Sequence, residues 1–265
     1  MFTIKQSVKF LGALSVLAAS LFSFSGPAAA APLPAGWTCS GKCGTLGADG
    51  VVTASPEGGT YGYVSTAGGA SDSGVVGGTN GSRARTGLFS ANAGDALNFY
   101  FNYVTSDGAG FADYAWVRLL DGAMSNVAVL FTARTTPGGN TVPGFGMAAL
   151  AAGVALVPPA TPIIAGGPAW SPLGGDSGGC YDTGCGYTDW VKMTYNIAAA
   201  GNYSLEFGVV NWLDTNYDSG LAFDGILVAG KPIDPDNGTV PEPASLALLG
   251  LGLAGLAIVR RRKMT

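Results

Sequence analysis

DALNFYFNYV, residues 95–104, alternates apolar and aromatic side chains with other residue types on a period of two. Its odd-numbered positions carry Leu97, Phe99, Phe101 and Tyr103, whereas Asn98 and Asn102 occupy the opposite phase. Successive side chains of a β-strand point to opposite faces of its sheet, so one face of this segment is apolar. The pattern predicts a half-buried strand whose odd-numbered residues face a core.

The same period recurs along the chain. Phe111–Leu120 places Ala115, Val117 and Leu119 on one face and Tyr114, Trp116 and Arg118 on the other. Further strands are predicted at Tyr61–Thr66, Arg83–Phe89, Asn126–Ala133, Tyr187–Ile197, Asn202–Asn211 and Leu221–Val228. In the last of these the apolar phase slips, which a β-bulge at Gly225 would explain. No helical stripe appears between the terminal segments, so we expect an all-β protein, an antiparallel β-sandwich of jelly-roll-like character.

Gly138–Gly175 does not follow the strand period. It is rich in Gly, Ala and Pro and has an apolar centre from Phe145 to Val157. Structureless loops of this length are uncommon inside a compact domain, so we expect one or two strands or a short helix here. The alternative is a flap or a partner surface, because an exposed apolar patch of that size would favour association.

Residues 1–31 are organised like a secretory signal peptide. Lys5 and Lys9 precede an apolar run, Leu11–Phe24, and Ala28–Ala31 supplies an Ala-x-Ala cleavage site. Cleavage is expected after Ala30 or Ala31, with an uncleaved anchor as the alternative. Residues 32–239 would then form the exported domain, which we call the body.

Residues 240–265 form a second processing segment. The break Val240-Pro241-Glu242-Pro243 precedes an uncharged apolar run, Ala244–Val259, and then come Arg260, Arg261, Arg262 and Lys263. A helix over the run would be roughly 24 Å long at about 1.5 Å per residue, slightly short of the ~30 Å hydrocarbon core of a bilayer. Cations beside a membrane segment resist translocation, so the body is expected to lie across the inner membrane from them.

A Pro-Glu-Pro break, a short transmembrane helix and a basic tail in this order resemble the PEP-CTERM sorting signal of Gram-negative bacteria. In that family a membrane-embedded exosortase recognises the signal and removes the tail near the Pro-Glu-Pro. The resemblance implies an exosortase and the export machinery as partners, anchoring in the inner membrane before processing, and delivery to the cell surface or the extracellular space. A permanent single-pass anchor is the alternative.

The resemblance also suggests a role for the body. Proteins of this family accompany exopolysaccharide production and serve the cell surface, biofilm or floc matrix. The body is therefore expected to be a structural or adhesive module that associates with exopolysaccharide. A carbohydrate-binding, lectin-like domain is the alternative from another functional class.

The body is strongly acidic. Removing the two processing segments leaves 7 of the 13 basic residues and 16 of the 17 acidic residues, a net charge near −9. Such a balance argues against binding nucleic acid or an anionic membrane surface through a basic patch. It is compatible with divalent cations or neutral glycans.

The four cysteines fall into two close pairs, Cys39 with Cys43 and Cys180 with Cys185. Exported thiols meet an oxidising compartment, so two disulfides are expected. We favour the two local bridges, each of which closes a small glycine-rich loop. A four-cysteine zinc site is the alternative, although both spacings are wider than C-x2-C.

The chain contains no histidine, which excludes histidine-dependent metal sites and most Cys/His nucleophile arrangements. Gly175-Asp176-Ser177-Gly178-Gly179 resembles the nucleophile motif of chymotrypsin-type serine proteases, but no imidazole can accept the serine proton. The body has two glutamates, Glu57 and Glu206, and nothing in the sequence places an aspartate opposite either of them for glycoside hydrolysis. We expect a non-enzymatic protein, with a hydrolase that uses an aspartate-based site as a further alternative.

Asp214-x-Asn216-x-Asp218 has the alternating oxygen ligands of a calcium loop. Ser219 and Gly225 stand where an EF-hand needs its glycine and its acidic twelfth ligand, so an EF-hand is excluded. A structural calcium site in a sandwich loop, with Asp224 as a further ligand, is the functional interpretation. The structural interpretation is a solvated Asx turn between two strands.

Aromatic residues supply the remaining candidates for a ligand site. Leu221–Val228 is similar to the last strand of carbohydrate-binding jelly rolls and of many exosortase-sorted surface proteins. A stacking platform for sugar rings could be built from the tryptophans, with Tyr114 or Tyr187 beside them. The alternative, that most of the tryptophans belong to the core or its rim, applies to Trp37, Trp116, Trp170, Trp190 and Trp212.

Overall fold

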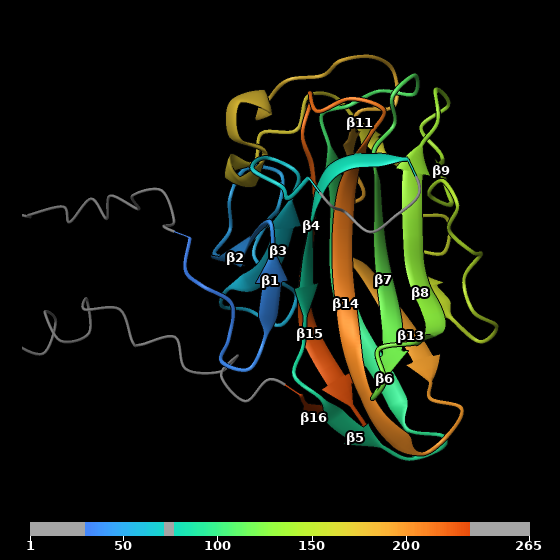
Figure 1. Cartoon of the computed structure of the whole chain (residues 1–265). Helices are drawn as coiled ribbons and strands as arrows, with labels where there is room; N and C mark the ends of the chain where they lie inside the picture. The colour runs from blue at the N-terminus through green and yellow to red at the C-terminus, as the bar shows by residue number, and fades with distance from the viewer. Residues whose placement is uncertain (1–29, 72–76, 234–265) are drawn as a thin grey trace, which may run out of the picture.

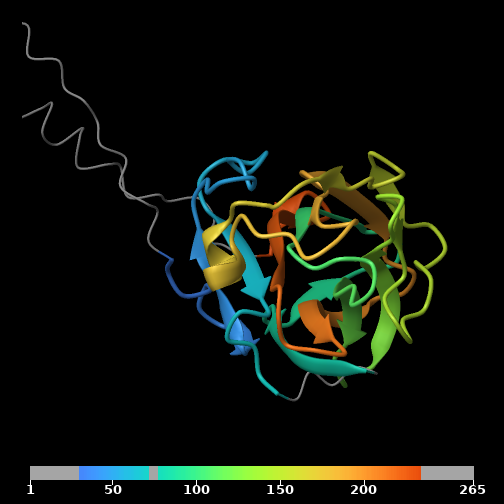
Figure 2. The same ribbon diagram turned by 90° about the horizontal axis from the view of Figure 1, so that it is seen from above.

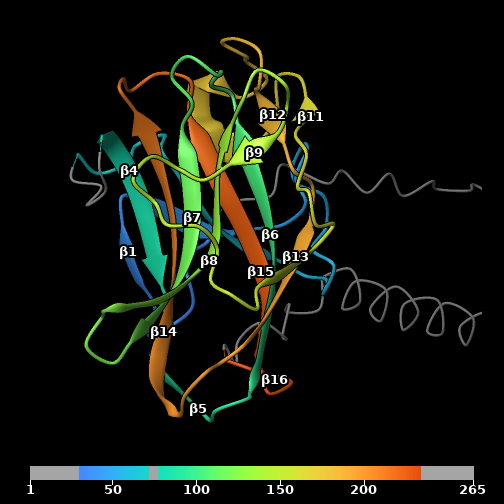
Figure 3. The same ribbon diagram turned by 90° about the vertical axis from the view of Figure 1, so that its right-hand side faces the viewer.

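The computed structural model describes residues 30–71 and 77–233, which form two antiparallel β-sheets packed face to face (Figures 1 and 3). The all-β prediction is confirmed. Within these two ranges no helix is long and apolar enough to cross a membrane. The predicted signal peptide, the transmembrane helix and the basic tail lie outside the described residues, and the jelly-roll character stays a prediction.

The seven-stranded sheet has the order β1-β4-β14-β7-β8-β9, and β5 pairs with the start of β14. It lies nearer the viewer in Figure 1. Its strands are β1 (Thr38–Ser40), β4 (Gly78–Arg85), β5 (Phe89–Ala91), β7 (Tyr114–Asp121), β8 (Asn126–Thr135), β9 (Thr141–Val142) and β14 (Gly201–Trp212).

The nine-stranded sheet has the order β10-β13-β6-β15-β3-β2; in addition, β12 pairs with β6 and with β11, and β16 pairs with β15. Seen from above, the two sheets enclose a shared interior (Figure 2). The strands are β2 (Lys42–Leu46), β3 (Tyr61–Ser65), β6 (Ala96–Thr105), β10 (Ala155–Val157), β11 (Ile164–Ala165), β12 (Gly186–Tyr187), β13 (Val191–Asn196), β15 (Ser219–Val228) and β16 (Lys231–Pro232).

The core lies between the two central strands, β6 and β14. The odd-numbered residues of β6 are fully buried in it, as the period predicted. Phe207 of β14 stacks on Phe223 of β15 with ring centroids 3.9 Å apart, and Trp37 covers Phe223 at 5.7 Å. Aromatic rings from both sheets therefore interlock, which fixes how the sheets face each other.

The predicted bulge in β15 is confirmed. The register of β15 against β6 shifts between Asp224 and Leu227, and Gly225 has a φ of 63°. A side chain at Gly225 would need this left-handed conformation and would also meet the Cγ of Glu57 at 2.6 Å. Glycine is the residue that tolerates both conditions, so the phase slip in the sequence has a backbone cause.

Two predicted strands are interrupted. Arg83–Phe89 spans the end of β4 and the start of β5, which pair with different parts of β14. Tyr187–Ile197 spans β12 and β13, both of which pair with β6. In each case the chain continues along the same neighbouring strand after a short break, so the alternation survives although the strand does not.

Gly138–Gly175 contains short elements, as expected from its length. It supplies β9, β10 and β11 and most of a 3₁₀ helix, η1 (Ser171–Asp176). Leu173 of this helix and Trp170 just before it are fully buried against the outer face of the nine-stranded sheet, beside Tyr61 and Tyr63. The segment therefore covers a sheet face with an apolar cluster of its own.

The two local disulfides are confirmed. Cys39 lies on β1 of one sheet and Cys43 on β2 of the other, so this bridge joins the sheets at the corner where the chain passes between them. Gly41, between them, has a φ of 83° and makes the turn. Because the closed loop is so short, the bridge restricts the unfolded chain little and mainly fixes this corner.

Candidate functional site

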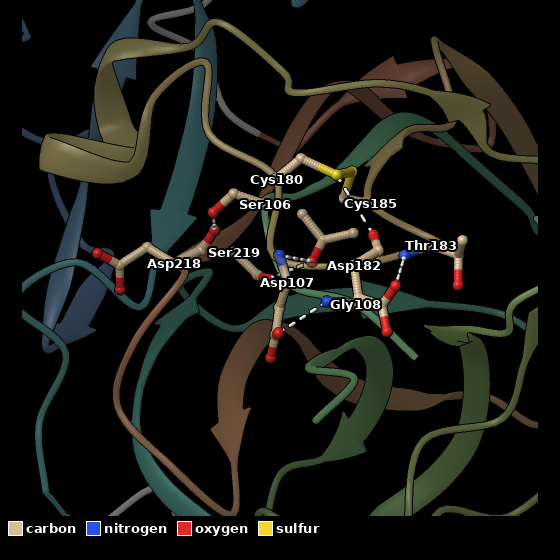
Figure 4. The surroundings of a disulfide bond; sticks show 10 residues. Ser106, Asp107, Gly108, Cys180, Asp182, Thr183, Cys185, Asp218 and Ser219 are labelled. Atoms are coloured by element: carbon tan, nitrogen blue, oxygen red, sulfur yellow. Dashed lines mark hydrogen bonds between the residues drawn. A yellow bond between two sulfur atoms is a disulfide. The ribbon is translucent and has the colours of Figure 1, made fainter. Parts of the chain in front are cut away.

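The second disulfide holds a loop against the end of the sandwich where β6 ends and β15 begins (Figure 4). The Tyr181 amide donates to the Ser106 carbonyl over 2.9 Å, and the Ala109 amide donates to the Thr183 carbonyl over 2.9 Å. The Cys180–Cys185 bridge closes the loop between these contacts. The loop thus packs on the turn that follows β6, and we call this part of the molecule the loop end.

Several carboxyl groups meet at the loop end. Asp113 is fully buried, and its Oδ1 accepts from the Trp212 amide over 3.0 Å while its Oδ2 accepts from the Ser219 hydroxyl over 2.6 Å. Asp218 accepts from the Thr66 hydroxyl over 2.7 Å, and its amide donates to the Asp176 carboxylate over 3.0 Å. These bonds tie β14, β15 and the loop after β3 together.

Asp107 is the least satisfied of these carboxyl groups. Its side chain is 1% exposed, and its Oδ1 accepts from the Gly108 amide over 2.7 Å. Its Oδ2 is buried without a hydrogen-bond partner among the described residues. Burial raises the pKa of Asp107 to about 7, and the negative charges of Asp214 and Asp176 add to the effect.

The neighbouring carboxyl groups shift in the same direction. Burial raises the pKa of Asp113 well above its ordinary value, and the charge of Asp107 raises it further. Burial and then the charge of Asp176 raise the pKa of Asp218. Burial and mutual repulsion therefore make these carboxyl groups release their protons at a higher pH than they would in water.

The four proposed calcium ligands do not all lie together in the structure. The Asp214 carboxylate accepts a hydrogen bond from the Asn216 amide over 3.2 Å, which is the Asx turn that the structural interpretation predicted. Asp218 immediately precedes β15. Asp224 lies six residues farther along β15, roughly 20 Å at the usual strand rise, and is bonded to the Ser55 hydroxyl. In residues 30–71 and 77–233 no three His, Cys, Asp or Glu side chains form a group that could hold a metal ion. Calcium binding at Asp214, Asn216 and Asp218 stays a prediction, and Asp224 does not lie with them.

The protease-like motif forms a turn. The Ser177 hydroxyl accepts from the Trp170 amide over 2.8 Å, and the Gly179 amide donates to the Asp176 carbonyl over 2.8 Å. The Asp176 carboxylate also accepts a hydrogen bond from the Asp218 amide. These residues hold η1 and its flanking chain against the sheet.

The tryptophans do not form an open platform within the described residues. Trp116 and Trp170 are fully buried, and the Trp170 indole N–H donates to the Tyr61 hydroxyl over 2.9 Å. The others are half-buried: Trp37 stacks in the core, Trp190 meets Tyr61 edge-on, and Trp212 stacks on Phe145 at 3.7 Å. The interpretation that they belong to the core and its rim is confirmed.

Sequence reasoning missed a different aromatic group at the loop end. Tyr181, between the two cysteines of the second disulfide, is 46% exposed. Its ring lies 5.7 Å from that of Phe111 and 5.0 Å from that of Tyr217. Tyr217 has a φ of 56°, an unusual conformation for a residue with a side chain. The sequence signal that could have found Tyr181 is its position between two bridged cysteines. A short disulfide loop restricts the backbone that carries the ring.

On the outer face of the seven-stranded sheet, Glu206 of β14 is fully buried between two arginines. Its Oε2 accepts from Arg85 over 2.7 Å, and its Oε1 accepts from the Arg118 guanidinium and from the Trp116 indole N–H, the latter over 3.0 Å. Burial alone would raise the pKa of Glu206, but the hydrogen bonds from Arg118 and Trp116 and the charge of Arg118 outweigh it, so the pKa is lowered. We call Glu206, Arg85, Arg118 and Trp116 the Glu206 network.

Residues 239–263 match the family model described as the PEP-CTERM protein-sorting motif. The chain carries a PEP-CTERM sorting motif. The match covers the Pro-Glu-Pro break, the apolar run and the basic tail that the sequence predicted. A PEP-CTERM motif implies export, processing by an exosortase and sorting to the cell surface.

No curated protein matches the chain. Among solved structures, the enzymatically active domain of tailspike protein 4 of bacteriophage CBA120 is 13% identical with a TM-score of 0.34, and the alignment covers 73% of this chain and 19% of that one. A cleaved adhesin domain of Lys-gingipain from Porphyromonas gingivalis is 10% identical with a TM-score of 0.35, and the alignment covers 78% and 100%. A structure titled "CBM4 structure and function" is 8% identical with a TM-score of 0.26, and the alignment covers 73% and 93%.

Proposed function

We propose that an exosortase processes this exported chain and that its body is a non-enzymatic, structural or adhesive part of an exopolysaccharide-rich surface matrix. The PEP-CTERM motif carries the proposal, because it assigns the chain to a route that ends at the cell surface. Two disulfides suit the oxidising side of the membrane.

The arrangement of the polar groups favours a non-enzymatic body. An aspartate-based hydrolase would need two carboxyl groups that reach a substrate, and Asp107 and Asp113 are the buried pair with raised pKa values. Their exposed fractions are 1% and 0%, and both oxygens of Asp113 are occupied by Trp212 and Ser219. The pair is better suited to holding the loop end than to meeting a polymer chain.

Changing Pro241, Glu242 and Pro243 to alanine should leave the basic tail on the protein. The exosortase would no longer recognise its signal, whereas the wild-type protein should lose the tail and reach the matrix fraction of its host. Intact-mass measurement of both proteins gives the answer, with Pro235→Ala and Asp236→Ala, just outside the motif, as controls. Removal of the tail from the triple variant would contradict the proposal.

A lectin-like function for neutral glycans is the second candidate, favoured by Tyr181. Its exposed ring is supported by Phe111 and Tyr217 and held by a disulfide, so little ordering is needed when a sugar stacks on it. Asp182, the next residue of the same loop, is exposed and has a carboxylate that can accept hydrogen bonds. Rigid aromatic groups beside polar side chains are a common way to hold a sugar ring.

Tyr181→Ala should weaken binding of a neutral oligosaccharide by about five- to tenfold, which corresponds to roughly 1–1.4 kcal/mol. The exported protein would first be screened on a glycan array, and the best neutral ligand would then be measured by calorimetry. Tyr100→Ala, on the outer face of the nine-stranded sheet and away from the disulfide loop, is the matched control. An array without any neutral ligand, or an equal loss in both variants, would remove this candidate.

A further inference from the structure

All four arginines of the body lie on the outer face of the seven-stranded sheet. Arg85 and Arg118 stand opposite Glu206 on either side of β14, and Arg83 stands opposite Gly208. Arg134 of β8 stands opposite Tyr114 of β7, which has the same phase as Arg118. The strands that carry the arginines and the glutamate, β4, β14, β7 and β8, lie side by side in Figure 1. We call this surface the arginine face.

The charge of the arginine face is opposite to that of the body. Among the described strand residues whose side chains point outward on the arginine face, Glu206 is the only acidic one, and it is fully buried. It balances one of the four positive charges, which leaves a local charge near +3 on a body with a net charge near −9. Positive charge is therefore concentrated on one face of a body whose net charge is negative.

Three of the four arginine side chains are held by their surroundings. Arg85 and Arg118 are held by Glu206, with 35% and 23% of their side chains exposed. The Arg134 guanidinium lies 4.2 Å from the centre of the Phe145 ring and donates to the Pro143 carbonyl over 3.2 Å. Side chains that are already ordered lose less entropy when they bind a ligand.

Arg83 differs from the other three. Within residues 30–71 and 77–233 its guanidinium has neither a hydrogen bond nor an ion pair. It lines an open hollow together with Arg85 and with Thr38, Cys39 and Ser40 of β1. A half-buried cation with hydroxyl-bearing residues beside it, and without a partner of its own, is suited to an anionic group from outside.

The spacing suits a polymer better than a small anion. Neighbouring strands are about 4.8 Å apart, so the three steps from β4 to β8 separate Arg83 from Arg134 by roughly 14 Å across the sheet. Arg118 lies on β7, between these two strands, and Arg85 lies on β4 two residues from Arg83. A planar guanidinium matches a carboxylate with two parallel hydrogen bonds, and several such groups spread over one surface can match repeated carboxylates.

We propose that the arginine face binds an acidic, carboxylate-bearing polysaccharide. The inference names the class of matrix polymer and so rests on the proposed function. Double-stranded nucleic acid is a poorer match, because it carries one charge per about 1.7 Å of its length and a body with this net charge repels so dense a chain more strongly. A polysaccharide with more widely spaced carboxylates can contact the arginine face while the rest of the chain stays away from the acidic parts of the body.

The test uses the exported protein with polygalacturonate as the acidic probe and dextran as the neutral probe. Wild-type protein should bind polygalacturonate, and the affinity should fall as salt is added, because exposed charges are screened. Arg83→Ala with Arg134→Ala should weaken binding at least about tenfold, on the basis of about fivefold for each exposed charge pair. Lys192→Ala with Lys231→Ala removes the same charge from the other sheet and should change binding less than twofold.

Single variants guard against misfolding of the double variant. Arg83→Lys keeps the charge but loses the planar fork and should weaken binding about threefold. Arg83→Ala should unfold at the wild-type temperature, since this guanidinium holds no other group. An equal loss in the lysine double variant would overturn the proposal, as would binding of single-stranded DNA at least as tight as that of polygalacturonate.

The outcomes separate this inference from the proposed function. Binding of dextran but not of polygalacturonate would overturn the arginine face as the site and leave the matrix role standing. Failure to bind either probe would overturn the arginine face. Absence of the processed protein from its host's matrix, measured separately, would overturn the proposed function.

Discussion

Glu206→Gln should lower the free energy of unfolding by about 2–4 kcal/mol. The carboxylate is fully buried and receives hydrogen bonds from Arg85, Arg118 and Trp116. Removing one member of a buried charge network typically costs about 3–5 kcal/mol because the partners are left uncompensated. The partly exposed arginines can regain water, which places the expected loss toward the lower end.

Glu57→Gln is the matched control for this prediction, because Glu57 is the other glutamate of the body and is exposed. It should change stability by less than about 0.5 kcal/mol. Urea unfolding followed by tryptophan fluorescence measures both variants. If Glu206→Gln were as stable as the wild type, the attraction within the Glu206 network would only offset the free-energy cost of removing its charges from water.

The protein should be most stable in mildly acidic solution and should lose stability as the pH rises from about 4 to about 7. The pKa of Asp107 is raised to about 7 in the folded state, against an ordinary value near 3.9 in the unfolded chain. Between these values the folded state binds more protons, so its advantage is complete below the unfolded pKa and is lost as the pH passes the folded pKa. Asp113 and Asp218 shift in the same direction. The change could reach about 4 kcal/mol for one such carboxyl group.

Asp107→Asn should flatten this pH dependence and raise stability at pH 8, because a neutral amide needs no proton. Thermal unfolding across the pH range measures the effect, with Asp182→Asn on the exposed part of the same loop end as the control. If the stability of Asp107→Asn fell with pH as steeply as that of the wild type, groups other than Asp107 would cause the pH dependence. Glu206 acts at the other end of the scale: its lowered pKa contributes stability that is lost only as the pH falls below its ordinary range.

Local periodicity was sufficient for the long strands and for the bulge. The β6 pattern survives because every odd-numbered residue from Leu97 to Tyr103 meets the core, and the slip at Gly225 is a property of the backbone itself. The short strands β1 and β2 could not be predicted, since Thr38–Ser40 and Lys42–Leu46 carry few apolar residues. They form because the chain turns at Gly41 and meets existing edges of both sheets.

The candidate sites depended on contacts that are distant in sequence. The pattern placed Arg118 with Tyr114 and Trp116 on one face of a strand, which the structure confirms. It could not place Arg83 or Arg134 on the same surface, because the register between strands is set by the whole core. For the same reason the net charge argued against any basic patch, although positive charge is concentrated on one face of the body.

The last long strand before the sorting tail is held on both sides. β15 pairs with β6 along one edge and with β3 along the other, while β16 is attached to it by two residue pairs. Tension applied through the chain beyond Ile233 would first peel away β16. It would then load the two ladders of β15 in shear, so that many hydrogen bonds would have to break together. A body built in this way should resist unfolding when it is pulled from its C-terminal end, the end at which an exosortase would process the chain.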